Sequence, residues 1–189
     1  TSKTAVCIIC GAGKFQGESD ATPAICIDCP TGRYLLDDGN FEKQHDAETD
    51  CLHCVAGKEF TSKTTVCINC GAGKFQGESD ATPAICVDCP IGRYMYLIDP
   101  NNSTEKEHDT KADCLFCIAG KQFESVSTKC SSCSFGLYQH ENSAPSVQCK
   151  FCIQGQAAPD SKSACEACIN GQYQEEEVTT VYECKSCDF

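Results

Sequence analysis

The sequence predicts a fold class of small disulfide-rich repeats: an elongated rod of stacked short β-hairpins with irregular loops and almost no helix. Cysteine supplies 20 of the 189 residues, a density at which cross-links take the place of a large hydrophobic core. All 20 cysteines fall into ten C-x-x-C pairs. In nine of the ten pairs a glycine follows the second cysteine by three residues, so the chain is a tandem array of one small unit.

Numbered 1 to 10 in chain order, the pairs are Cys7/Cys10, Cys26/Cys29, Cys51/Cys54, Cys67/Cys70, Cys86/Cys89, Cys114/Cys117, Cys130/Cys133, Cys149/Cys152, Cys165/Cys168 and Cys184/Cys187. The glycine after a pair predicts a turn with positive φ. The basic–aromatic step behind it, as in Gly32–Tyr34, predicts a short strand, and we expect the returning strand at Ala24–Cys26, after Pro23. A unit this short cannot bury a core alone, so each aromatic should pack on its neighbour and on a disulfide.

Three pairs together form a longer repeat. Residues 1–30 and 61–90 are identical at 27 of 30 positions, and successive pairs are spaced by 19, 25 and 16 residues, then 19, 28 and 16, then 19, 16 and 19. The array therefore divides into three cysteine-rich super-repeats, 1–60, 61–123 and a shortened 124–189. No linker rich in Pro and Gly separates them, so we expect stacked parts of one array.

Charge and hydropathy argue against several classes of partner. The 15 Lys and Arg against 27 Asp and Glu leave a formal net charge of −12, which cannot neutralise phosphates and disfavours nucleic acid and anionic membranes. The chain lacks the apolar run of ~18 residues that a membrane span needs, so we expect no membrane insertion in this segment. The cysteine density indicates an oxidising compartment and hence an extracellular or cell-surface location.

Two chemistries compete for the cysteines. Consecutive C-x-x-C pairs at this spacing are also typical of zinc sites with four cysteine ligands. Five such sites would each carry a charge of about −2, added to a chain already at −12 without clustered basic residues. We therefore favour disulfides and expect no metal and no cofactor, with a multi-zinc protein as a less favoured alternative. Thiol–disulfide catalysis is disfavoured because a redox enzyme uses one tuned pair.

The odd number of pairs in the super-repeat constrains the disulfide connectivity. If neighbouring pairs were cross-linked two by two, the near-identical segments 1–30 and 61–90 would be wired differently. A ladder avoids this, because the second cysteine of each pair then bonds the first cysteine of the next. The predicted bonds are Cys10–Cys26, Cys29–Cys51, Cys54–Cys67, Cys70–Cys86, Cys89–Cys114, Cys117–Cys130, Cys133–Cys149, Cys152–Cys165 and Cys168–Cys184. Two-by-two wiring, which uses all 20 cysteines, stays the alternative.

The ladder leaves Cys7 and Cys187 without a partner in the chain. Either the chain belongs to a longer array whose neighbouring repeats supply the missing cysteines, or Cys187 of one subunit forms an intermolecular disulfide with Cys7 of another. The second arrangement is a head-to-tail homopolymer. The expected partner is therefore the chain itself or the neighbouring repeats of a longer chain.

The two long repeats carry variable loops at residues 35–50 and 95–113. The second loop contains two overlapping glycosylation sequons that begin at Asn101 and Asn102, so we expect an N-glycan on one of them. The first loop contains Asp37–Asn40, which lacks the alternating acidic spacing of a calcium-binding loop. We therefore expect glycosylation but no calcium site.

The chain has no recognisable set of catalytic residues. No nucleophile is accompanied by a base in a known catalytic pattern, and the histidines are scattered among the predicted loops. We expect these histidines to be solvated: His45, His53, His108 and His140. The sequence therefore predicts no enzymatic activity.

Two segments carry a family resemblance. Cys26–Tyr34 and Cys86–Tyr94 have the form C-x-x-C-P-x-G-x-Y, with the next C-x-x-C pair further on. This pattern resembles the cysteine-rich ephrin-receptor-like repeats and, more loosely, the tumour-necrosis-factor-receptor cysteine-rich modules. The chain departs from it after Gly155, where no aromatic follows, and in the 25- and 28-residue spacings. The resemblance implies an extracellular, elongated, disulfide-rich array, and it implies no particular ligand because the family is defined by its scaffold.

We therefore expect a non-enzymatic extracellular structural protein, a disulfide-laddered rod that assembles head-to-tail into a fibre or cell-surface coat. The near-identity of residues 1–30 and 61–90 favours this role, because a rod needs identical joints whereas a ligand-binding array diverges at its contact surface. The alternative is a ligand-binding or adhesion segment of a cell-surface receptor ectodomain.

Overall fold

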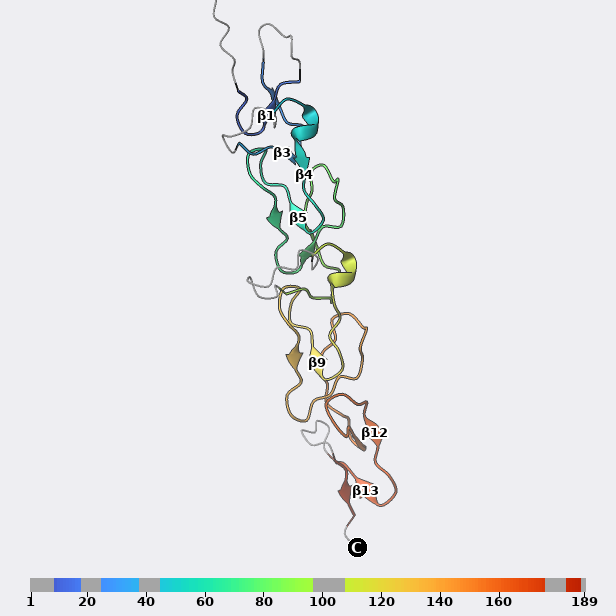
Figure 1. Cartoon of the computed structure of the whole chain (residues 1–189). Coiled ribbons are helices and arrows are strands. Elements are labelled where there is room, and N and C mark those ends of the chain that lie inside the picture. The colour runs from blue at the N-terminus through green and yellow to red at the C-terminus, as the bar shows by residue number, and fades with distance from the viewer. Residues whose placement is uncertain (1–8, 18–24, 38–44, 97–107, 176–182, 188–189) are drawn as a thin grey trace, which may run out of the picture. The chain divides into compact units, whose positions relative to one another are not determined.

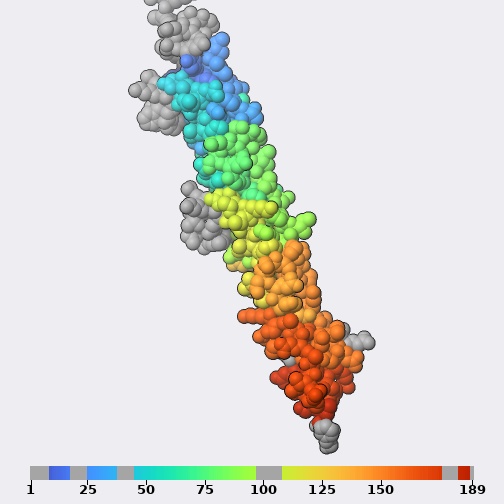
Figure 2. All heavy atoms as spheres, turned by 90° about the vertical axis from the view of Figure 1, so that its right-hand side faces the viewer, coloured from blue at the N-terminus to red at the C-terminus, as the bar shows by residue number. Residues whose placement is uncertain are grey.

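The computed structural model describes residues 9–17, 25–37, 45–96, 108–175 and 183–187. Contacts between Cα atoms group the chain into two compact units. The first comprises Thr1–Gly71, Phe75–Val87 and Thr104–Lys111, and the second comprises Ala72–Lys74, Asp88–Ser103 and Ala112–Phe189. Repeats that follow one another in the sequence adjoin, as the successive colours of Figure 2 show. The division into three super-repeats stays a prediction.

The repeats form antiparallel hairpins whose strands are two residues long (Figure 1). The strands are β1 (Lys14–Phe15), β2 (Ile27–Asp28), β3 (Arg33–Tyr34), β4 (Leu52–His53), β5 (Lys58–Glu59), β6 (Ile68–Asn69), β7 (Lys74–Phe75), β8 (Val87–Asp88), β9 (Lys121–Gln122), β10 (Ser131–Ser132), β11 (Gln156–Ala157), β12 (Glu166–Ala167), β13 (Gln172–Tyr173) and β14 (Lys185–Ser186). Helical structure in the described residues is limited to two 3-10 turns, η1 (Glu48–Asp50) and η2 (Lys111–Asp113). The predicted class of small disulfide-rich repeats with short hairpins and almost no helix is confirmed for this part of the chain.

The returning strand of each hairpin consists of the two residues inside the C-x-x-C pair. In the first hairpin, Lys14 pairs with Asp28 and Phe15 pairs with Ile27. The prediction of a returning strand at Ala24–Cys26 is therefore wrong for Ile25 and Cys26, since the strand begins one residue after Cys26, and Ala24 lies outside the described residues. The physical reason is a backbone hydrogen bond: the N–H of Cys29 donates to the carbonyl of Gly13 at 2.8 Å. Because Cys29 lies opposite Gly13, the two residues before it, Ile27 and Asp28, lie opposite β1.

The glycine after each pair adopts the conformation that the repeat predicts. In the nine glycines φ lies between 75° and 85°, a region that costs an L residue about 1–2 kcal/mol. The first of them, Gly13, also forms two backbone hydrogen bonds to the following repeat. Its N–H donates to the carbonyl of Leu35 and its carbonyl accepts from Cys29, both at 2.8 Å.

Five aromatics of the described repeats pack against a disulfide. Phe15 is buried with Leu35 against the cysteines of the Cys29–Cys51 bond. Tyr34 packs on Cys54–Cys67 and Tyr94 on Cys117–Cys130, each the next disulfide along the chain, as for Phe15. Phe60 and Phe123 pack on the same two bonds, which close their own repeats. The prediction that aromatics and disulfides share a thin core is confirmed at these repeats. Tyr173 in β13 differs, because 41% of its surface is exposed.

Replacing Phe15 by Ala should expose the Cys29–Cys51 bond and loosen the first hairpin. Removing a buried Phe side chain costs about 3 kcal/mol, so the Cys29 amide, which bonds Gly13, should exchange its hydrogen more than tenfold faster. Hydrogen exchange by NMR measures this locally. Tyr173→Ala is the matched control, since Tyr173 occupies the same repeat position but is half exposed; it should change the Cys187 amide, which bonds Gly171, less than Phe15→Ala changes Cys29. Equal effects would contradict the packing described.

Candidate functional site

The candidate site is the disulfide ladder. The described residues contain nine disulfides, each joining the second cysteine of one pair to the first cysteine of the next. The bonds are Cys10–Cys26, Cys29–Cys51, Cys54–Cys67, Cys70–Cys86, Cys89–Cys114, Cys117–Cys130, Cys133–Cys149, Cys152–Cys165 and Cys168–Cys184. These are the nine pairs of the predicted ladder, and two-by-two wiring is absent from the described residues. Their Cα–Cα separations of 5.6–5.8 Å are ordinary for disulfides.

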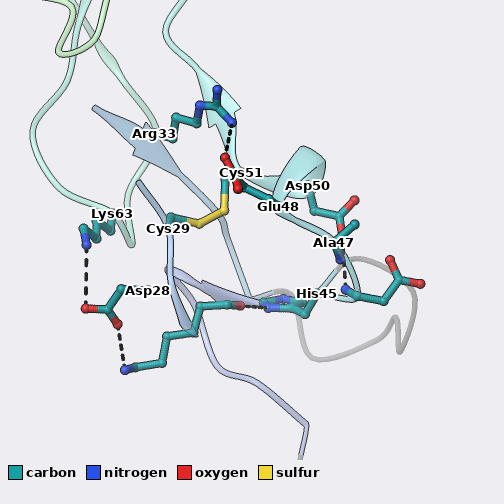
Figure 3. The surroundings of a disulfide bond; sticks show 11 residues. Asp28, Cys29, Arg33, His45, Ala47, Glu48, Asp50, Cys51 and Lys63 are labelled. Carbon is teal, nitrogen blue, oxygen red and sulfur yellow. Dashed lines mark hydrogen bonds and ion pairs between the residues drawn. A yellow bond between two sulfur atoms is a disulfide. The ribbon is translucent and has the colours of Figure 1, made fainter. Parts of the chain in front are cut away.

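Polar contacts lie around the Cys29–Cys51 bond and involve residues 46–50, the last residues of the long loop before Cys51 (Figure 3). Arg33 Nη1 donates to Glu48 Oε1 at 3.3 Å, which ties η1 to β3. The Asp50 carboxylate accepts from the backbone N–H groups of Asp46 and Ala47 at 3.1 and 2.9 Å. This carboxylate therefore satisfies backbone donors at the start of η1, next to the disulfide.

The prediction that His45 is solvated is wrong. Only 7% of the surface of His45 is exposed. Its Nδ1–H donates to the carbonyl of Lys14 at 2.8 Å, and its own carbonyl accepts from the N–H of Gln16 at 2.8 Å. The second super-repeat has the equivalent backbone hydrogen bond, in which the N–H of Gln76 donates to the carbonyl of His108 at 2.9 Å. At both places the histidine carbonyl therefore hydrogen-bonds the residue that directly follows the strand, β1 or β7.

The structure describes some of the other predicted site residues and not others. Cys187 is an exposed free thiol. Cys7, the sequon residues Asn101 and Asn102, and residues 38–40 of the considered calcium loop lie outside the described residues. Among the described residues, no group of three or more His, Cys, Asp or Glu side chains could hold a metal ion. The nine bonds occupy 18 cysteines, so these sulfurs are not thiolates.

A long-range contact that the sequence analysis missed links repeats three pairs apart. The space beside a positive-φ glycine, where a Cβ would stand, is filled by a later loop; we call this space the glycine site. A Cβ on Gly13 would lie 3.0 Å from the Cβ of Lys63, and one on Gly32 would lie 2.8 Å from the Cα of Pro83. The backbone N–H of Leu35 also donates to the Lys63 carbonyl at 2.9 Å.

The same contact recurs in the second unit. A Cβ on Gly73 would lie 3.0 Å from a side-chain atom of Val126, and one on Gly92 would lie 2.6 Å from a side-chain atom of Pro145. A Cβ on Gly120 would lie 2.9 Å from a side-chain atom of Lys162. In all five cases the glycine follows one C-x-x-C pair, and the covering residue comes from the loop before the third pair after it. The covering residue lies three or four positions before the first cysteine of that later pair. A sequence signal existed: residues 61–64 and 81–83, which carry these contacts, repeat residues 1–4 and 21–23 without change.

An ion pair adds to the contact at Gly13. Lys14 Nζ lies 2.7 Å from Asp28 Oδ1, and Lys63 Nζ lies 3.6 Å from Asp28 Oδ2. The hydrogen bond and charge of Lys14, and then the charge of Lys63, lower the pKa of Asp28. Since this pKa is lowered in the folded state, the ion pairs stabilise at neutral pH and their contribution is lost as the pH falls through the folded-state pKa.

The ladder and its glycine sites define the chain as a disulfide-bonded, cysteine-rich repeat module of the extracytoplasmic kind. No family model matches the chain. It is similar to thyroglobulin of Rattus norvegicus, with 28% identity over 123 residues, which are 65% of this chain and 4% of that protein. The chain thus corresponds to about 4% of the relative's length. Within the described residues, no helix is long and apolar enough to cross a membrane.

Replacing Lys63 by Val should raise the pKa of Asp28 while keeping the glycine site filled. The second unit already has Val126 at the corresponding place, so valine fits the site and only the charge is removed. Titration of the Asp28 carboxyl carbon by NMR measures the change. Lys14→Gln should raise this pKa further, because Lys14 supplies both the hydrogen bond and the larger charge effect. An unchanged Asp28 pKa in Lys63→Val would show that this contact between repeats is not formed in solution.

Proposed function

We propose that the chain is a non-enzymatic extracellular structural module, a disulfide-laddered array that joins head-to-tail into a fibre or cell-surface coat. The observation that carries this proposal is the position of Cys187. Every preceding pair in the described chain uses its second cysteine to bond the next pair, whereas Cys187 is exposed and unbonded. Its backbone is already in the ladder arrangement, because its N–H donates to the carbonyl of Gly171 at 2.8 Å.

The likeness of the joints supports a structural role. Gly13 N–H bonds the Leu35 carbonyl at 2.8 Å, and Gly73 N–H bonds the Met95 carbonyl at 2.7 Å. The ion pair between Lys14 and Asp28 at 2.7 Å likewise recurs in the second super-repeat at 2.9 Å. Equal joints between repeats give an array that can be extended by adding units.

Formation of the intermolecular bond needs an oxidant of the disulfide class. The Cys187 thiolate attacks glutathione disulfide, forms a mixed disulfide and releases one glutathione. The Cys7 thiolate of a second copy then attacks the Cys187 sulfur and releases the second glutathione. Two thiols are oxidised and one glutathione disulfide is reduced to two thiols, which suits an oxidising extracellular compartment. An N-glycan on Asn101 or Asn102 and the ephrin-receptor-like scaffold belong to the same proposal.

A receptor or adhesion segment is the second candidate, and exposed apolar side chains favour it. At five successive C-x-x-C pairs the residue after the first cysteine is aliphatic and between 49% and 55% exposed: Ile27, Leu52, Ile68, Val87 and Leu115. The corresponding residues further on are Ser131, Lys150, Glu166 and Lys185. Exposed apolar residues at a repeated position could contact another protein.

Non-reducing electrophoresis and negative-stain images of protein equilibrated in glutathione buffer test the proposal. The wild-type chain should form a series of covalent multimers that disappear on reduction. Cys187→Ser and Cys7→Ser should each remain monomeric when oxidised alone, while a mixture of the two should stop at the dimer, because each retains one of the two thiols. A wild-type chain that stays monomeric would contradict head-to-tail assembly and favour the receptor segment.

A further inference from the structure

Two glycine sites in the second unit are open. Gly155 and Gly171 have φ values of 77° and 85°, so their backbones match those of the covered glycines. A Cβ on either would meet no atom of the described residues within 4 Å. The covered sites are filled from the pair three further along, and for Gly155 and Gly171 those pairs would be numbers 11 and 12.

We propose that a second copy of this chain fills both open sites, with its residues Lys3–Thr4 on Gly155 and its residues Thr22–Pro23 on Gly171. This inference rests on the proposed head-to-tail assembly and specifies its docking surface. Within one chain, Lys63–Thr64 cover Gly13 and Thr82–Pro83 cover Gly32. The sequences around these covering residues are repeated in the proposed docking segments: residues 1–4 equal 61–64, and residues 16–26 equal 76–86.

The register of the disulfide ladder independently selects the same residues. If Cys187 bonds Cys7 of the second copy, the pairs Cys7/Cys10 and Cys26/Cys29 of that copy become pairs 11 and 12. The covering residue lies three or four positions before the first cysteine of such a pair. Four positions before Cys7 is Lys3, and three positions before Cys26 is Pro23. The two open glycine sites and the free thiol of Cys187 therefore both predict a second copy whose Cys7 is bonded to Cys187.

The surface beside the open sites is hollow and acidic. A cavity of about 340 Å³ is lined by residues that flank both glycines, including Ala157, Ile169 and Gln172. Glu166 and Glu183 also line it, whereas residues 1–4 carry one lysine and no acidic residue. The charge of Lys3 thus complements the cavity, as the charge of Lys63 complements Asp28 in the covered site.

The contact depends on the glycine more than on the covering side chain. Lys63, Pro83 and Val126 differ in size and charge, yet each fills a glycine site. A methyl group on the glycine would occupy the space that these loops enter. Gly155→Ala should therefore block docking of the second copy. The open space around Gly155 spares the monomer a steric clash, although alanine at this positive φ costs about 1–2 kcal/mol of backbone strain.

The test compares the yield of the Cys7–Cys187 dimer in glutathione buffer for the wild type, Gly155→Ala and a control, Gly71→Ala. Gly71 also has no atom within 4 Å of its Cβ position, but it lies outside the proposed surface and is not a positive-φ glycine. It therefore controls for the added methyl group, and the folding checks on Gly155→Ala control for backbone strain. We expect Gly155→Ala to lower the dimer yield at least tenfold and Gly71→Ala to change it less than twofold. Disulfide mapping and the reactivity of Cys187 with a thiol reagent check that each monomer is folded.

A photo-crosslinking residue at position 3 gives a second readout that does not depend on the glycine variant folding. In the oxidised wild-type background it should label the segment around Gly155 of the neighbouring copy, and a probe at position 22 should label the segment around Gly171. If the wild type forms the Cys7–Cys187 bond but Gly155→Ala matches it and no such labelling occurs, the docking surface is wrong and head-to-tail assembly stands. If the wild type forms no Cys7–Cys187 bond, both proposals fail.

Discussion

The structure depends on the closure of each hairpin by one glycine and one disulfide. Strands of two residues cannot persist alone in water, and the buried clusters contain only a few side chains. A disulfide that closes a loop of this size stabilises by about 3 kcal/mol in the chain-entropy model. The positive-φ glycine then supplies backbone hydrogen bonds to two other segments, as Gly13 does with Cys29 and Leu35. Disulfides and backbone hydrogen bonds thus provide the stabilisation that a hydrophobic core provides in larger domains.

The covering loops turn this local closure into longer-range order. Because Lys63 packs on Gly13 and Pro83 packs on Gly32, a repeat contacts both its neighbour and a loop three pairs further on. Contacts of this reach couple the hairpins within each unit, as expected for arrays stabilised by interfaces between repeats. In residues 61–90 they give the residues before the cysteines a structural role as well, because residues 61–64 and 81–83 carry these contacts.

Features set by local chemistry could be predicted from the sequence, and features set by spatial stacking could not. The glycine turns follow from the absence of a Cβ, and the ladder follows from the odd number of pairs in a repeat whose copies must be wired alike. The position of β2 could not be read from Ala24–Cys26, because the Cys29–Gly13 hydrogen bond decides it. Burial of His45 and the filling of the glycine sites also depend on how closely successive repeats stack, which no spacing of residues reveals.

The central claim is the ladder, and mapping of the disulfide-linked tryptic peptides tests it most directly. Trypsin cuts after Lys14, Arg33 and Lys43, so residues 15–33 form one peptide that holds both Cys26 and Cys29. The ladder predicts that this peptide is joined both to the peptide with Cys10 and, through Cys29–Cys51, to residues 44–58. If residues 15–33 are joined by two bonds to the peptide with Cys7 and Cys10 alone, the cysteines are wired two by two and the ladder is refuted.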